Sequence, residues 1–195
     1  MRFTRLAAIP VLALAAGACF GGGSKPTELL TLTAAETLPP GAVRSAGDGQ
    51  AVAVTTPNVP RALASTRIPV YVSATSIQYL VNAVWVTQPK ELFRTLLSET
   101  IAARTGRLVL DPSNFSAASG TTLSGQLLQF GFDPTRMEVV VAYEAALSRG
   151  EQPLQTQRFE SRVPVTGQTA LIIAPALNQA ANQVAEQVAD WVGRG

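Results

Sequence analysis

Apolar side chains recur at every second position from Met137 to Leu147, and this alternation constrains the fold more than any other feature of the chain. Glu138 and Glu144 fall on the opposite face of the same run. A period of two is typical of a β-strand with one buried face. We therefore expect a sheet built around this strand, with the two carboxylates as solvated surface and not as a catalytic pair.

The segments on either side of this run complete a β-meander over residues 121–165. In the preceding segment the apolar positions change parity at the Leu127–Leu128 pair, so a β-bulge is expected there or at Gly125. In the following segment Phe159 alternates with charged residues, which favours an edge strand.

Shorter strands are expected before the meander, because short apolar runs there are bounded by glycine and proline turns. They cover residues 27–33, 51–54, 68–71, 76–81 and 107–110.

Residues 89–105 predict an amphipathic helix, with Pro89 in its first turn and Gly106 just beyond its end. Its apolar stripe favours packing onto the sheet, and a lipid or partner groove is the alternative. The residues that such a contact would use are Trp85, Leu92, Phe93 and Leu96.

A second helix is expected over about 170–192, since Leu177, Ala181, Val184 and Val188 recur at helical spacing. Its other face is rich in asparagine and glutamine, which indicates solvated surface or, as the alternative, a homo-oligomer contact. Together the elements predict an α+β fold: a mixed, largely antiparallel sheet with the two main helices packed on one face.

The N-terminus has the features of a secretory signal. Arg2 and Arg5 precede an apolar run that is too short to cross a bilayer, and small residues lead to Cys19, the only cysteine. This pattern resembles a bacterial lipobox, in which the cysteine thiol is acylated after residues 1–18 are removed. A plain secretory signal cut at Ala18 is the alternative, but it gives no reason for the cysteine to follow the cut.

Acylation at Cys19 would leave the mature protein on a membrane anchor, because two or more acyl chains attach a protein stably. Residues 19–26 would form the lipidated cysteine and a glycine-rich tether, and residues 27–195 a single domain. Phe20 stands where aspartate would retain such a lipoprotein at the inner membrane, so the outer membrane is expected.

Composition excludes several classes of function. The chain has no histidine, which rules out histidine-dependent catalysis and histidine metal ligands. Without the two signal arginines, its 15 basic residues fall to 13, equal to its 13 acidic residues, and no basic face for nucleic acid is indicated. There is no nucleotide-binding glycine loop and no catalytic constellation, so we expect neither a cofactor nor an enzyme.

Four blocks in order, residues 59–112, 123–151, 158–165 and 174–192, resemble the ABC-type transport auxiliary lipoprotein family, which includes paraquat-inducible protein C. The family often carries an acidic residue soon after its tryptophan, whereas Val86, Thr87 and Gln88 follow Trp85 here. The resemblance implies an α+β domain with helices on a mixed sheet.

The resemblance also implies a periplasmic, outer-membrane lipoprotein that works with an MCE-domain protein, its permease and its ATPase in lipid transport between membranes. Two other classes stay open. One is an outer-membrane assembly lipoprotein that partners a β-barrel. The other is a stand-alone lipid-binding module, which would need an apolar cavity between the sheet and helix 89–105.

Overall fold

The computed structural model describes residues 28–47, 49–113 and 120–194, so Cys19, the signal peptide and the tether lie outside the described residues. Its strands form a seven-stranded mixed sheet. They are β1 (Val52–Val54), β2 (Arg67–Ser73), β3 (Ser76–Val84), β4 (Val109–Leu110), β5 (Thr121–Asp133), β6 (Glu138–Arg149) and β7 (Gln155–Pro164). The helices are α1 (Pro89–Thr105), α2 (Ala170–Gly193) and a short 3-10 helix, η1 (Arg61–Leu63).

The long strand β5 organises the sheet because both of its edges are paired. Antiparallel β6 follows one edge along its whole length. The other edge is shared by parallel β1 at one end and parallel β2 at the other. The antiparallel β2–β3 hairpin therefore extends the sheet at one corner, and β1 with β4 extends it at another.

The predicted meander is confirmed, including its irregularity. The β5–β6 register shifts between Leu127 and Gln129, which places the bulge at Leu128. Gly125 does not host the bulge but allows two strands to approach closely. A Cβ at this position would clash with the carbonyl oxygen of Glu144, at 2.2 Å. Strand β7 pairs only with β6 and is an edge strand, as its polar alternation indicated.

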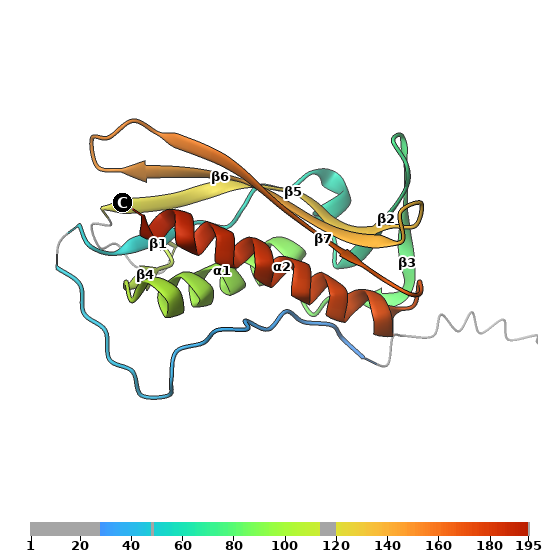
Figure 1. The fold of residues 1–195 in the computed structure, drawn as a ribbon, viewed down its shortest axis with the longest axis horizontal. Coiled ribbons are helices and arrows are strands. Elements are labelled where there is room, and N and C mark those ends of the chain that lie inside the picture. The colour runs from blue at the N-terminus through green and yellow to red at the C-terminus, as the bar shows by residue number, and fades with distance from the viewer. Residues whose placement is uncertain (1–27, 48, 114–119, 195) are drawn as a thin grey trace, which may run out of the picture.

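Both helices cover the sheet, and the predicted α+β class is confirmed (Figure 1). Helix α1 has the predicted bounds, and Gly106 ends it in the left-handed conformation with φ of 71°. Helix α2 packs against α1 and against β6 and β7. Its alanines 176, 180, 181, 185 and 189 are buried, and small side chains allow this close approach on several sides.

The expected strand over residues 27–33 is wrong. Residues 28–47 form an extended segment, here called the N-terminal strap, whose only β-pairing is a single bridge between Leu30 and Trp85. Figure 1 shows the strap along the side of the two helices that faces away from the sheet. The Leu- and Thr-rich sequence favours extended backbone, but only Leu30 exchanges backbone hydrogen bonds with the chain at the end of β3, at Val84 and Val86. The amides of Thr33 and Ala35 bind helix side chains instead.

Two asparagines of α2 hold the strap. The Thr33 amide donates to Asn178 Oδ1 at 2.8 Å, and the Ala35 amide donates to Asn182 Oδ1 at 2.7 Å. Asn182 Nδ2 donates back to the Thr33 carbonyl at 3.0 Å. Part of the amide-rich face, expected to be solvent or an oligomer contact, is thus covered by the chain's own N-terminal segment.

Charged groups fasten the strap further along. Arg104 of α1 pairs with Glu36 at 2.6 Å and with Asp190 of α2 at 2.9 Å, so one guanidinium joins the strap to both helices. Arg44 donates to the carbonyls of Ala102 and Arg107 at the C-terminal end of α1. The strap therefore runs from the N-terminal ends of the helices to their C-terminal ends.

We expect Asn182→Ala to lower the free energy of unfolding by about 1–3 kcal/mol, because it leaves the Ala35 amide and the Thr33 carbonyl without this partner. Urea denaturation measures the change. The matched control is Gln179→Ala, an exposed amide on the same helix, which should stay within about 0.5 kcal/mol of wild type. Equal stability of Asn182→Ala and wild type would contradict the role of this contact.

Candidate functional site

The sequence-predicted contact residues lie mainly in the core. Trp85, Phe93 and Leu96 have exposed fractions of 1%, 0% and 2%, and only Leu92 is partly exposed. The first three therefore offer no surface to a partner or a lipid in this conformation. Their burial agrees with the interpretation of the α1 stripe as packing onto the sheet.

Trp85 joins three parts of the chain. Its amide donates to the Thr66 carbonyl, its neighbours bracket Leu30 of the strap, and its indole meets the edge of Phe130 at 5.6 Å between ring centroids. Within the described residues nothing accepts a hydrogen bond from its indole nitrogen. The free energy gained by burying this large side chain outweighs the cost of leaving its N–H without a hydrogen-bond acceptor.

The surface is hollowed at a different place, between the β2–β3 hairpin and the β5–β6 turn. This hairpin groove has a volume of about 740 Å³. Its apolar lining includes Leu63, Tyr71, Val72, Ile77 and Leu128. Val72 and Ile77 are 38% and 47% exposed, so the groove presents apolar side chains to its surroundings.

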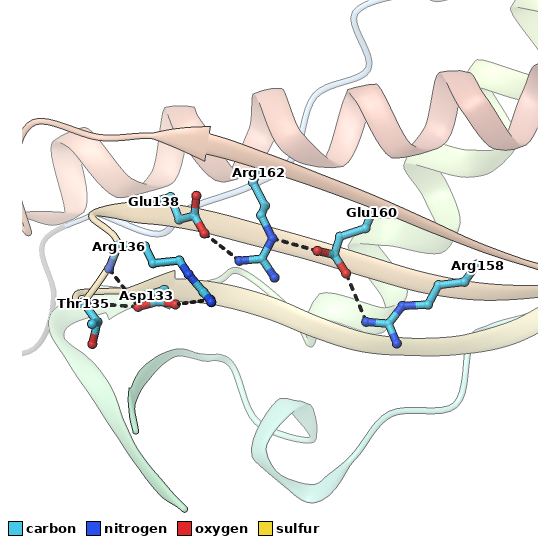
Figure 2. Close-up of polar contacts among 7 residues, drawn as sticks. All are labelled: Asp133, Thr135, Arg136, Glu138, Arg158, Glu160 and Arg162. Atoms are coloured by element: carbon cyan, nitrogen blue, oxygen red, sulfur yellow. Dashed lines mark hydrogen bonds and ion pairs between the residues drawn. The ribbon is translucent and has the colours of Figure 1, made fainter. Parts of the chain in front are cut away.

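The rim of the hairpin groove is polar and rigidly built. Asp133 closes the β5–β6 turn by accepting from the backbone amides of Thr135 and Arg136, and its other oxygen pairs with the Arg136 guanidinium at 3.3 Å (Figure 2). An apolar floor with a charged rim is the usual anatomy of a protein interface.

A row of charges lies beside this turn on β6 and β7. Figure 2 shows Arg162 between Glu138, at 2.6 Å, and Glu160, at 2.7 Å, with Arg158 on the far side of Glu160 at 3.0 Å. We call these four residues the charge ladder. It places alternating charges on an edge strand, where they discourage unwanted pairing with another strand.

The charge ladder shifts the pKa values of its members. Hydrogen bonds from Arg162 first and Arg158 second hold the pKa of Glu160 below its ordinary value, because they stabilise the ionised carboxylate. The hydrogen bond to Glu138, followed by that to Glu160, raises the pKa of Arg162. Both groups are therefore charged at neutral pH.

Partial or full burial keeps two phenols neutral by raising their pKa values. Burial raises the pKa of Tyr143, whose hydroxyl donates to the Ser124 carbonyl at 2.9 Å. Burial also raises the pKa of Tyr71, although the hydrogen bond from the Phe130 amide opposes the shift. These hydroxyls fix the β5 backbone and are not placed to transfer protons.

Glu138 and Glu144, the two carboxylates on one face of the predicted strand, have different neighbours in the structure. Glu138 is paired in the charge ladder, and Glu144 lies opposite Arg158 in the β6–β7 register. Within the described ranges no three acidic or thiol side chains gather where they could share a metal ion. None of the helices in the described part of the chain combines the length and hydropathy that a membrane crossing needs.

Comparison with known proteins identifies the family. The sequence model of the ABC-type transport auxiliary lipoprotein component matches residues 31–189, from the strap to the last turns of α2. The chain belongs to this family. This match confirms the resemblance seen in the sequence. Membership in the family associates this auxiliary lipoprotein with an ABC transport system.

Two solved structures share the fold of this auxiliary lipoprotein. Protein XCC0632 from Xanthomonas campestris is 19% identical, with a TM-score of 0.67 over 85% of this chain and 94% of that one. An uncharacterized protein is 15% identical, with a TM-score of 0.62 over 86% and 98% of the two chains. A sequence search of curated proteins returned no match.

Sequence reasoning missed the hairpin groove, because its lining comes from four separate segments. It recognised the polar alternation of Arg158, Glu160 and Arg162 but not their pairing with Glu138. The residues Arg158, Glu160 and Arg162 alternate between positive and negative charge along β7. Such an alternation predicts ion pairs between neighbouring strands and could have pointed to Glu138 as a partner.

The lowered pKa of Glu160 predicts a pH effect on stability. The ionised carboxylate stabilises the fold above its unfolded pKa, and this contribution is lost as pH falls through the lower folded pKa. Stability should therefore fall less between pH ~5 and ~3 in Glu160→Gln than in wild type. Urea midpoints at each pH measure the slope.

Arg162→Gln provides the second variant for this test. It keeps the Glu160 carboxylate but removes the donor with the largest influence on its pKa. The acid slope should therefore also become shallower. A slope as steep as that of wild type in both variants would contradict the role given to the charge ladder.

Proposed function

We propose that this protein is the outer-membrane-anchored, periplasmic accessory subunit of an ABC transport system that moves lipid between membranes. Its immediate partner would be an MCE-domain protein, which works with a permease and an ATPase. The family match over residues 31–189 carries this proposal. The subunit would bind and position its partners without catalysing a reaction.

The anchor would be acyl chains on Cys19. Removal of residues 1–18 as a signal peptide would expose this cysteine at the new N-terminus, and residues 19–26 would serve as the tether to a single domain over residues 27–195. Phe20 in place of aspartate supports sorting to the outer membrane.

The hairpin groove is the surface we assign to the MCE partner. It combines an apolar floor around Val72 and Ile77 with the charged rim of Asp133 and Arg136. Strand β3 forms an outer strand of the sheet and pairs only with β2 among the named strands. A partner can therefore reach both side chains and backbone groups at this corner.

Two alternatives lead to different partners. An assembly lipoprotein would bind a β-barrel at this groove. A stand-alone lipid-binding module would need space between the sheet and α1, where Phe93, Leu97 and Ile101 have exposed fractions of 0% and belong to the packed core. That packing favours the accessory role. Self-association into a homo-oligomer stays a prediction.

We expect Cys19→Ala to fold normally and to lose its membrane attachment, because no acyl chain can form on alanine. Fractionation of the envelope after a salt wash, with far-UV circular dichroism of the purified variant, measures both properties. A Cys19→Ala protein that stays in the washed membrane fraction would show that the lipid anchor is not what holds it.

A mild-detergent pull-down of the full-length protein from its native envelope, with identification by mass spectrometry, tests the partner. Wild type should recover an MCE-domain protein, its permease and its ATPase. Ile77→Asp, which places a charge in the hairpin groove, should reduce this recovery at least tenfold, a loss of about 1.4 kcal/mol of binding free energy.

The matched control for this pull-down is Val43→Asp, since Val43 is an apolar residue of the strap that is 95% exposed and lies outside the groove. It should recover the partners as wild type does. Recovery of a large β-barrel instead would favour the assembly role, and recovery of lipid without protein would favour the stand-alone module.

A further inference from the structure

Exposed apolar side chains gather at the end of the molecule where the strap begins. Leu29 and Val86 are 60% and 53% exposed. Leu30 and Trp85, which bridge to each other, face the core. Because side chains alternate along extended backbone, Leu29 and Val86 project away from the core at this bridge.

The first turn of α2 contributes two more exposed side chains, Leu171 at 80% and Ile172 at 36%. They belong to the uncharged stretch ALIIAPAL at residues 170–177. The apolar side chains in the first turn of a helix are normally buried against other residues. Here the described residues leave Leu171 and Ile172 exposed.

The strap and α2 bring these two groups to the same end. Thr33 lies beside Asn178 and Ala35 beside Asn182, so the strap and the helix run in the same direction. Leu29 precedes Thr33 by about 13 Å of extended chain, and Leu171 precedes Asn178 by about 10 Å of helix. Figure 1 shows the start of the strap beside the start of α2 and the end of β3.

The same end is where the chain departs toward Cys19. The described chain begins at Glu28, nine residues after the cysteine. Nine residues reach at most about 30 Å when fully extended. A bilayer that holds acyl chains on Cys19 would therefore lie within this distance of Glu28, the residue before Leu29.

We propose that Leu29, Val86, Leu171 and Ile172 form a membrane-contact surface that rests in the headgroup and acyl-chain boundary of the bilayer. This inference depends on the lipid anchor of the proposed function. The short tether keeps the bilayer close, and exposed leucine and isoleucine side chains gain by leaving water for the acyl chains. The contact would orient the domain and hold the opposite ends of the helices away from the membrane.

The test uses the full-length acylated protein in vesicles of phosphatidylethanolamine and phosphatidylglycerol. Because Cys19 is the only cysteine and its thiol is acylated, Leu171→Cys introduces a single reactive thiol for an environment-sensitive fluorophore. Leu29→Cys provides a second position. Val43→Cys is the matched control, since Arg44 beside it binds the C-terminal end of α1.

Flotation of unlabelled wild type with the vesicles first tests the anchor. The membrane-contact surface predicts blue-shifted emission at residues 171 and 29, with loss of most of the fluorescence when the lipids carry bromine on their acyl chains. The label at residue 43 should keep the emission it has in water.

Three results would overturn the inference. Emission as in water at residues 171 and 29 would show that this end does not meet the bilayer. A blue shift without quenching by brominated lipid would show a protein neighbour. In both of these cases, flotation of wild type would still support the lipid anchor. The third result is failure of wild type to float, which would refute the anchor and this inference together.

Discussion

Helix α2 is enclosed by the sheet, by α1 and by the N-terminal strap, and the arrangement of the whole chain depends on how its faces are divided. Apolar side chains such as Leu177, Val184 and Val188 are fully buried in the core. Asn178 and Asn182 instead bind the backbone of the strap. An amide side chain can satisfy both a donor and an acceptor of an extended chain, which an apolar side chain in the same place cannot do.

The two surfaces that we propose as contacts both lie toward the end of the molecule where α2 begins (Figure 1). The strap begins at the N-terminal ends of the helices, where Leu171 of α2 is exposed. The hairpin groove lies between the β2–β3 hairpin and the β5–β6 turn. This turn contacts the segment that leads into α2, because Val165 and Gln168 both donate hydrogen bonds to Met137. If both proposals hold, the bilayer and the protein partner would approach neighbouring parts of the domain.

Much of the fold could be predicted because its signals are local. The alternation from Met137 to Leu147 determines a strand, and the stripe and stop signals of residues 89–105 determine a helix, whatever lies around them. The bulge at Leu128 could also be predicted, because the apolar positions of this segment change from odd to even residue numbers at the Leu127–Leu128 pair. The polar alternation of β7 likewise predicted an edge.

The features that were missed depend on contacts between distant parts of the chain. Residues 27–33 have the composition of a strand, but Thr33 binds Asn178 and Asn182, which lie far along the chain and do not enter a local pattern. From the sequence alone, Trp85 and Phe93 fit a contact surface as well as a core, because large apolar side chains serve both. The hairpin groove brings Leu63 and Leu128 together, and no local pattern shows such a meeting.

The most direct test of this account is hydrogen–deuterium exchange at the backbone amides of Thr33 and Ala35. The hydrogen bonds from these amides to Asn178 and Asn182 predict that both exchange slowly in wild type. Asn182→Ala should make the Ala35 amide exchange much faster, while the β5–β6 ladder stays protected. Exchange at Thr33 and Ala35 as fast as in an unfolded chain, already in wild type, would show that the strap is not held by α2 and would contradict the account.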